Sequence, residues 1–252
     1  MNSSYHRRVA VHGDLGTSTS SQLLGLSPAL LVPVGSTEQH GPHLPLDTDT
    51  RIAAAVAQSV AARLTGDPSA AAPRQQWLVA PPVAYGASGE HQSFPGTVSI
   101  GTEALTTLLV EYGRSASCWS PRLVFVNGHG GNVAALRSAV SLLRAEGRDA
   151  GWCPCTVAGA DAHAGHTETS ILLHISPGEV RTDRWRPGNS APLPELIPSM
   201  RRGGVAAVSE VGVLGDPTTA TVEEGERLFA EMVVGCARAI SGWAPGADGM
   251  LT

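Results

Sequence analysis

PRLVFVNGHGGNVAALRSAVSLLRAE, residues 121–146, contains in one stretch the unit from which the chain is built. The short apolar run at residues 123–126 predicts a buried strand. A glycine-rich turn that carries His129 follows it. Asn132 is a residue type that begins helices, so a helix is expected from there to about Glu146. The stretch therefore predicts a strand, a turn with a histidine, and a helix.

The same alternation continues on both sides of this stretch. Further strands are predicted at residues 29–34, 77–80, 151–157 and 205–208, and further helices at about 50–64, 102–117, 168–175 and 221–240. Residues 186–204 carry four Pro and three Gly and are expected to form a long loop. Strands that alternate with helices indicate an α/β layered fold with a mostly parallel sheet.

A chain of 252 residues suits one domain, and no repeat or linker divides it. We therefore expect a single domain over residues 1–252. Residues 1–15 and 243–252 are expected to be loose, and residues 66–73 to form a surface loop. The four Cys are expected to be buried or idle thiols.

Composition excludes several classes of function. The net charge of −5 argues against a nucleic-acid partner, because phosphate binding needs a basic face. All 17 basic residues are Arg, which rules out Schiff-base chemistry on a Lys. No apolar run reaches the roughly 20 residues of a membrane span, and the N-terminus lacks the apolar segment of a signal peptide. We therefore expect a cytoplasmic protein.

Histidine and acidic residues gather directly after three of the predicted strands. The groups are Glu38, His40, His43, Asp47 and Asp49 after the first strand, His129 after the central one, and Asp161, His163, His166 and Glu168 after the next. In an open parallel sheet, ligands bind beyond the carboxyl ends of the strands. Three strands would thus deliver these side chains to one crevice, whereas His6, His12 and His174 are expected to be ordinary polar residues.

The spacing of these residues suits a metal site. Glu38 and His40, two apart, face the same side of an extended loop, but would diverge by about 200° in a helix. Asp49 lies where the following helix begins. Nitrogen and oxygen ligands without a thiolate suit Zn, Mn or Fe. Five ligands exceed what one Zn needs, and a carboxylate can bridge two ions.

Two rival enzyme classes fit the residues less well. A dinucleotide loop, G-x-G-x-x-G, would need Gly where Val133 stands. The residues around Ser88, YGASGE, lack the G-x-S-x-G elbow of many serine hydrolases.

Four motifs in the chain are similar to those of the creatininase family of amidohydrolases. They are E-x-H-G-x-H-L-P at residues 38–45 with Thr48-Asp49, S-x-E-H-x-x-F-P-G-T at 88–97, N-G-H-G-G-N at 127–132, and H-A-G-x-x-E-T-S at 163–170. The resemblance spans roughly residues 29–175. It implies a three-layer α/β/α sandwich with a mainly parallel sheet, two divalent metal ions (Zn, Fe or Mn) per chain, and a homo-oligomer.

The resemblance also implies roles for the metal-site residues. Glu38, Asp49 and His129 would hold one ion, and His40, Asp49 and Glu168 the other, with Asp49 as the bridge. Creatininase itself has a Glu where this chain has Gly131. We assign the role of that missing carboxylate to Glu168, and the departure argues against creatinine as the substrate.

The resemblance further implies a reaction in which a metal-activated water attacks an amide. His163 is our candidate for protonating the leaving nitrogen, and Glu90 is the next candidate. Ser88, Glu90 and His91 are expected to line the substrate pocket, where Glu90 could bind a substrate amine.

Within the family, the chain looks most like members that release a C-terminal Val-Tyr-derived dipeptide from a modified ribosomal precursor peptide. The alternatives are an enzyme for another small amide, such as a cyclic amide or a formamide, a catalytically silent metal-binding subunit, and a nucleotide-binding oxidoreductase.

Overall fold

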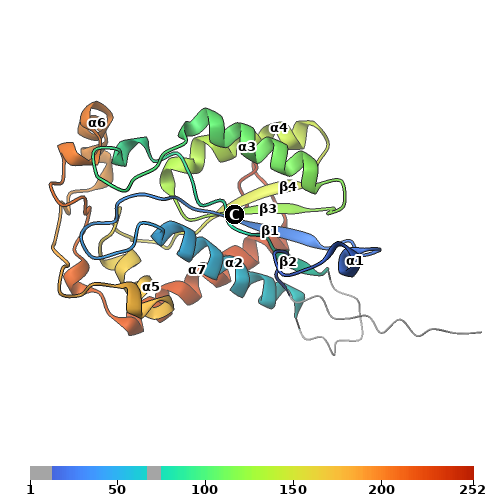
Figure 1. Ribbon diagram of the computed structural model, residues 1–252, viewed down its shortest axis with the longest axis horizontal. Coiled ribbons are helices and arrows are strands. Elements are labelled where there is room, and N and C mark those ends of the chain that lie inside the picture. The colour runs from blue at the N-terminus through green and yellow to red at the C-terminus, as the bar shows by residue number, and fades with distance from the viewer. Residues whose placement is uncertain (1–12, 67–74) are drawn as a thin grey trace, which may run out of the picture.

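The computed structural model describes residues 13–66 and 75–252, and its centre is a parallel sheet (Figure 1). Within these residues the sheet has four strands in the order β2-β1-β3-β4. The strands are β1 Ala29–Val34, β2 Trp77–Val79, β3 Leu123–Asn127 and β4 Ala150–Pro154. All the pairings are parallel, so the carboxyl ends of the four strands share one edge.

The central strands are apolar along their whole length because both faces of the sheet are covered. All six residues of β1 are buried. Ala29 and Leu31 belong to the core on one face, and Leu30, Val32 and Val34 to the core on the other. A strand that is buried on both sides reads as a continuous apolar run, which is why the sequence identified this one.

Helices cover both faces of the sheet, as Figure 1 shows. One face carries α3 Gly101–Ala116 and α4 Val133–Ala145, which pack against each other. The other face carries α2 Thr48–Thr65, α5 His166–Ile175 and α7 Val222–Gly242. The expected three-layer α/β/α fold with a parallel sheet is confirmed.

Short elements connect these layers. They are α1 Ser20–Leu23, α6 Leu193–Gly203, and the 3₁₀ turns η1 Gly89–His91, η2 Gly130–Asn132, η3 Pro177–Glu179, η4 Val205–Ala207 and η5 Pro217–Thr219. The helix α6 lies beyond the carboxyl ends of the strands, at the left-hand end of Figure 1.

The prediction of a long loop at residues 186–204 is wrong, because α6 forms inside it. Pro194 lies in the first turn, where a helix has no internal partner for the N–H that proline lacks. Pro198 lies inside the helix on its exposed side. Leu196 and Met200, four apart, pack against Val205 and Leu214. The helical spacing of these two apolar residues therefore favours a helix here, although the four prolines of the segment favour a loop.

The strand predicted at residues 205–208 is also wrong. Residues 205–207 form η4, in which Val205 is buried and the next two residues are exposed. One buried residue followed by two exposed ones is not the alternation of a strand.

The chain ends are more ordered than expected where the structure describes them. The backbone N–H of Leu251 donates to the carbonyl oxygen of Trp152 (2.9 Å), and the N–H of Trp152 donates to Gly249 (3.0 Å). Residues 243–252 are therefore not loose. At the other end, the N–H of Leu15 donates to Val79 (2.8 Å), so residues 13–15 pair with β2. Residues 1–12 and the loop predicted at 66–73, apart from Gly66, lie outside the described residues, as do His6 and His12.

In the part of the chain that the structure describes, no helix is both long enough and apolar enough to cross a membrane. The four Cys are free thiols, three of them buried and Cys118 exposed.

The contact between the C-terminal tail and β4 predicts a stability effect. Leu251 is 2% exposed, so Leu251→Ala should lower the free energy of unfolding by about 2–5 kcal/mol through lost packing and a residual cavity. Leu24, which is 84% exposed, is the matched control, and Leu24→Ala should change it by less than about 0.5 kcal/mol. Urea unfolding of both variants checks this, and equal effects would mean that the tail does not pack as described.

Candidate metal centre

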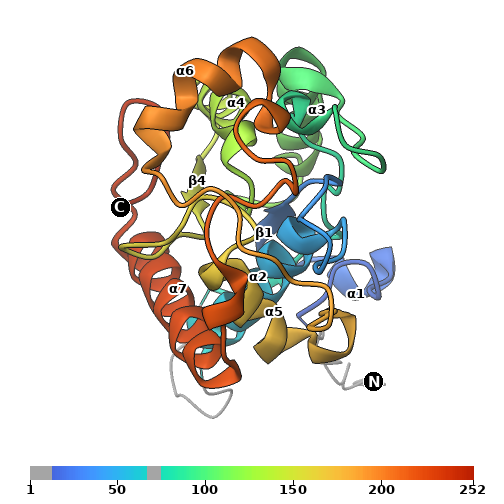
Figure 2. The ribbon, with the colours of Figure 1, turned by 90° about the vertical axis from the view of Figure 1, so that its left-hand side faces the viewer.

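The predicted His and carboxylate residues meet at the carboxyl edge of the sheet. The loops after β1, β3 and β4 all leave the sheet there, and Figure 2 views the molecule from this end. Asp49 lies in the first turn of α2, and Glu168 in the first turn of α5. Both helices therefore point their positive ends at the same place, which favours negative charge there.

Asp49 lies between two histidines. Its Oδ1 is 3.2 Å from Nε2 of His40, and its Oδ2 is 3.2 Å from Nδ1 of His129. The hydroxyl of Ser36 donates to Oδ2 at 2.7 Å. His40 Nδ1 lies 3.1 Å from the carbonyl oxygen of Glu38 and donates to it, which directs Nε2 toward Asp49. One carboxylate thus joins the loops after β1 and β3.

Three groups of side chains hold their ligand atoms close enough for a metal ion. They are Glu38, Asp49 and His129; His40, Asp49 and Glu168; and Glu38, His40 and His163, each with ligand atoms within 4.8 Å of one another. Asp49 belongs to the first two groups. The five residues expected to be ligands are therefore together, in two groups that share one carboxylate.

Glu38 shows most directly that this cluster suits a cation. The residue is 0% exposed, and neither carboxylate oxygen accepts a hydrogen bond of acceptable geometry. His129 Nε2 is 3.2 Å from Oε2, and His91 Nε2 is 3.4 Å from Oε1. A buried carboxylate without a well-formed hydrogen bond is costly, and a metal ion would satisfy both of its oxygens.

The pKa values follow from this crowding of charges. Burial raises the pKa of Glu38 to about 7 and that of Glu168 to about 7. Burial opposes charge on His40 and His129 as well, but the neighbouring carboxylates outweigh it and raise both pKa values to about 10. Burial also disfavours charge on Asp49, yet the two imidazoles hold its pKa well below the usual range. The site thus holds protons that a cation would displace.

The loop before α5 fixes Glu168 by unusual local structure. Ala164 is buried and has a φ of +51°, a left-handed conformation that costs energy for any residue except glycine. Its N–H donates to Oε2 of Glu168 at 2.6 Å, and this same oxygen is 3.9 Å from His40 Nε2. Asp161 accepts hydrogen bonds from the first backbone N–H groups of α5. Local strain here holds the carboxylate toward the other ligands.

His163 has one nitrogen engaged and one free. Its Nε2 is 2.8 Å from the carbonyl oxygen of Gln39 and donates to it, so Nδ1 is the unprotonated nitrogen. Nδ1 lies 3.8 Å from Oε1 of Glu38. Burial, together with the nearby His40 and His91, holds the pKa of His163 well below its usual value. A neutral imidazole with a free lone pair therefore faces the cluster, beside His40 and His91 (ring centroids 4.4 Å from each).

The three residues expected to line the substrate pocket lie at the same cluster. Ser88 and His91 are buried, and Ser88 Oγ is 3.5 Å from His129 Nε2. Glu90 is more open, with a side chain 31% exposed, and its Oε1 is 3.8 Å from His129 Nε2. Glu90 thus lies between the buried cluster and the surface.

Gly131 lies where no side chain fits. A Cβ at this position would be 2.4 Å from His129 Nε2 and 2.3 Å from the carbonyl oxygen of Ala87. A longer residue here would therefore move the loop that carries His129. Gly131 has no side chain and so contributes no carboxylate to the site. The carboxylate of Glu168 lies beside His40 instead.

The sequence did not identify the residues that hold this site in place. The side-chain amide of Gln39 contacts His91 Nδ1 (2.8 Å), His163 Nε2 (3.1 Å) and the carbonyl oxygen of Gly212 (3.0 Å). His43 Nε2 is 2.9 Å from Thr169 Oγ1, which joins the Glu38 loop to α5. Gln39 and His43 both lie inside the first motif, and this position in the sequence could have indicated that they belong to the site. Their residue types do not indicate which distant residues they contact.

A surface hollow of about 390 Å³ borders the cluster at Gln39. Phe94 and Trp185 give it aromatic side chains, Pro42 and Pro95 add apolar surface, and the other lining residues are Gly41, Leu46, Asp183, Arg184, Arg186, Glu210 and Val211. It is a half-apolar space next to the two histidines that Gln39 contacts.

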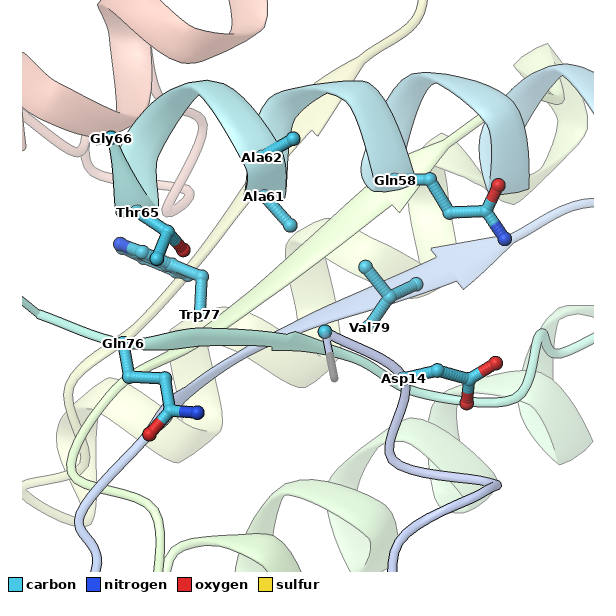
Figure 3. A pocket seen from close by; sticks show the side chains of 10 residues that line it. Asp14, Gln58, Ala61, Ala62, Thr65, Gly66, Gln76, Trp77 and Val79 are labelled. Atoms are coloured by element: carbon cyan, nitrogen blue, oxygen red, sulfur yellow. The ribbon is translucent and has the colours of Figure 1, made fainter. Parts of the chain in front are cut away.

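A separate cavity of about 450 Å³ lies between α2 and β2 (Figure 3). It is lined by Trp77 and Val79 of β2, by the C-terminal half of α2, and by Gly13 and Asp14. The C-terminal half of α2 lies at the amino edge of the sheet, away from Asp49 in the first turn. None of the lining residues is a His, Cys, Glu, Lys or Arg, so this cavity offers no comparable chemistry.

Sequence comparison places the chain among known proteins. The family described as creatinine amidohydrolase (creatininase) matches residues 17–240. The chain is 72% identical to the mycofactocin precursor peptide peptidase of Mycobacterium tuberculosis and 70% identical to that of Mycolicibacterium smegmatis, over all of each chain. It is 30% identical to the creatinine amidohydrolase of Pseudomonas putida, over 84% of this chain and 88% of that protein.

Solved structures agree with these relatives. A structure described as creatininase Mn matches with a TM-score of 0.75 and 26% identity, over 93% of this chain and all of that one. A mutant creatininase of Zn-Zn type matches with a TM-score of 0.76 and 26% identity, over 94% of this chain and all of that one. Fold, family match and relatives agree, and the chain belongs to the creatininase family.

Proposed function

We propose that this protein is a two-metal peptidase that cleaves the mycofactocin precursor peptide. The observation that carries the metal chemistry is the pair of ligand groups that share Asp49, with the carboxylate of Glu38 buried among them without a well-formed hydrogen bond. The substrate is proposed from the full-length relatives at 70–72% identity, which are named as peptidases of this precursor. The bond cleaved is the one that releases a C-terminal Val-Tyr-derived dipeptide.

In this proposal Glu38, Asp49 and His129 hold one divalent ion, and His40, Asp49 and Glu168 hold the second. These oxygen and nitrogen donors suit Zn, Fe or Mn. Mn and Zn are the metals named for the two creatininase structures that match this fold. When bound, such ions supply Lewis acidity toward the amide carbonyl and hydroxide at neutral pH.

His163 moves the proton in this reaction. Its free Nδ1 faces the cluster, so it first accepts a proton from the attacking water. It then donates this proton to the leaving amine, which could not depart as an anion. The carbonyl of Gln39 holds the ring in the tautomer that leaves Nδ1 free. This refines the expected role, because a neutral imidazole must act as a base before it can act as an acid.

The remaining residues position the peptide. Glu90, partly exposed beside His129, binds an amine or amide N–H of the substrate and is the alternative proton donor. Ser88 and His91 shape the buried side of the pocket. The hollow with Phe94 and Trp185 offers the Tyr-derived ring an aromatic surface.

The rest of the proposal concerns the whole molecule. The chain acts as one domain within a homo-oligomer, in which exposed apolar side chains such as Tyr85, Val98 and Leu46 are candidates for the subunit contacts. Its place is the cytoplasm, where the buried free thiols Cys153, Cys155 and Cys236 suit a reducing environment.

Mass spectrometry of the modified precursor peptide tests the function. Metal-loaded protein should convert it to a shortened peptide and a Val-Tyr-derived fragment, and protein treated with a chelator should not. An intact precursor after incubation with fully loaded protein would reject the peptidase, and cleavage at another bond would reject the assigned product.

Asp49 and Asp47 provide a matched pair of variants. Asp49 faces both ligand groups, whereas Asp47 pairs with Arg51 (2.7 Å) and has a side chain 45% exposed. Asp49→Asn should lose both ions and essentially all turnover, while Asp47→Asn should keep close to two ions per chain. Elemental analysis and peptide cleavage measure both, and one ion at saturation in the unmodified protein would rule out the two-metal site.

His163 should separate catalysis from metal binding. His163→Ala should keep near-normal metal content but lose about 10²–10⁴ in kcat, the usual contribution of a general acid–base. Glu168→Gln should lose metal as well as rate. His174, on the same helix as Glu168, serves as the control, and His174→Ala should keep both. A His163→Ala protein that loses an ion would show instead that this side chain is a ligand.

Metal binding should reverse how pH affects stability. Without metal, His40 and His129 have pKa values of about 10 in the fold against about 6.5 unfolded, so their contribution is complete below about pH 6.5 and is lost as pH rises toward about 10. Glu38 and Glu168, raised to about 7, likewise destabilise the fold once they ionise. Bound ions need the deprotonated ligands, so their contribution grows with pH.

The difference in Tm between metal-loaded and metal-stripped protein should therefore be larger at about pH 9 than at about pH 6. Thermal unfolding of both forms at the two pH values measures it, with excess metal removed beforehand. A difference that is the same at both pH values would mean that the cluster does not exchange its protons for ions.

A further inference from the structure

A groove of about 520 Å³ runs between η1 and the C-terminal end of α6. It is lined by Gly89, Glu90, Gln92 and Ser93 on one side and by Met200, Arg201, Arg202, Gly203 and Gly204 on the other. The motifs that point to the metal centre include the first of these segments, but nothing so far has given the second a role.

Close backbone contact holds α6 beside the metal centre. Gly204 has a φ of +67°, and its N–H closes the helix by donating to Met200 (2.7 Å). A Cβ on Gly204 would be 2.5 Å from the carbonyl oxygen of Glu90, so only glycine lets the two backbones approach this closely. The end of α6 is thus seated against the residue whose carboxylate is 3.8 Å from His129 Nε2.

The groove is positively charged on its α6 side. Arg201 and Arg202 are both exposed, and Arg202 Nη2 donates to Ser199 Oγ at 2.9 Å. Among the residues that the structure describes, no acidic side chain lies within ion-pair distance of either guanidinium, whereas the exposed Arg137 and Arg227 each pair with a carboxylate. Glu90 is the acidic residue that lines the groove, at its end nearest the metal centre.

A groove that begins at Glu90, beside the metal centre, and presents two guanidinium groups without an acidic partner suits a chain with a carboxylate. Arg binds carboxylates through two parallel hydrogen bonds, which gives direction as well as charge. Basic residues in the last turn also stabilise a helix, but that effect would alter unfolding and not the affinity for a substrate. Peptide affinity and the free energy of unfolding, measured on the same variants, therefore distinguish carboxylate binding from stabilisation of the helix end.

We infer that Arg201 and Arg202 bind a carboxylate of the peptide substrate in this groove and so help to select the peptide. The inference rests on the proposed peptidase function. The carboxylate belongs either to an Asp or Glu side chain of the peptide or to its C-terminus, and the experiment separates these sources.

The test compares two matched double variants. Arg201→Ala with Arg202→Ala removes two charges from the groove. Arg63→Ala with Arg238→Ala removes two exposed charges from a hollow between α2 and α7. The first pair should raise KM for the precursor peptide by about 10-fold or more, with the loss falling on KM rather than kcat. The control pair should leave KM within about twofold of the unmodified enzyme.

Peptide variants identify the source of the carboxylate. One peptide has every Asp and Glu replaced by Asn and Gln, and a second has an amidated C-terminus. The peptide that lacks the relevant carboxylate should bind the unmodified enzyme about 10-fold more weakly and should no longer distinguish it from the groove variant. Added salt should weaken binding of the unmodified enzyme more than that of the groove variant.

Three results would overturn the inference. They are an unchanged KM in the groove variant, an equal rise in the control pair, or a difference between enzymes that persists with a peptide lacking both kinds of carboxylate. Fluorescence anisotropy of a labelled precursor peptide measures the same contrast without cleavage. If the groove variant binds the peptide more weakly than the control pair does but no form of the enzyme cleaves it, the role of the groove is supported and the proposed reaction is wrong. If the peptide is cleaved and both variants bind it equally well, the reaction is supported and the role of the groove is wrong.

Discussion

The buried carboxylate of Asp49 between His40 and His129 is the contact on which the site depends. It joins the loops after β1 and β3 to the first turn of α2, at a place where the helix favours negative charge. An isolated charge could not be buried there at tolerable cost, so the two imidazoles must be delivered with it. A parallel sheet does this simply, because the strands that bear the loops end at one edge.

Forming the site lowers the stability of the folded chain. Neither oxygen of the Glu38 carboxylate accepts a hydrogen bond of acceptable geometry, and Ala164 is held in a left-handed conformation beside Glu168. Active sites commonly store strain and unpaired charge of this kind, which the rest of the fold must offset. Here the two apolar layers on either face of the sheet do so, and they bury every strand residue except Pro154, which is half-buried. The side chains that could hold a cation therefore already lie together in the fold.

The sequence predicted those parts of the fold in which one local pattern is decisive. The buried strands read as apolar runs, and His129 and Asp49 could be placed because each follows a strand or opens a helix. It failed where tertiary contacts decide, as in α6, whose prolines suggested a loop, and in the tail, where Leu251 pairs with Trp152. Gln39 shows the same limit inside the site. Its neighbours in sequence are ligands, but its three partners come from distant segments.

The surroundings of the metal cluster bear on the size of the substrate. A small cyclic amide needs one enclosed pocket, whereas an enzyme that cuts within a peptide must accommodate chain on both sides of the scissile bond. This cluster borders two separate spaces, a half-aromatic hollow at Gln39 and a basic groove at Glu90. Gly131, which brings no side chain between His129 and Glu90, helps to keep the second one open. The same family fold that serves creatinine hydrolysis can thus serve a peptide, because the difference lies in what surrounds the ligands rather than in how they are delivered.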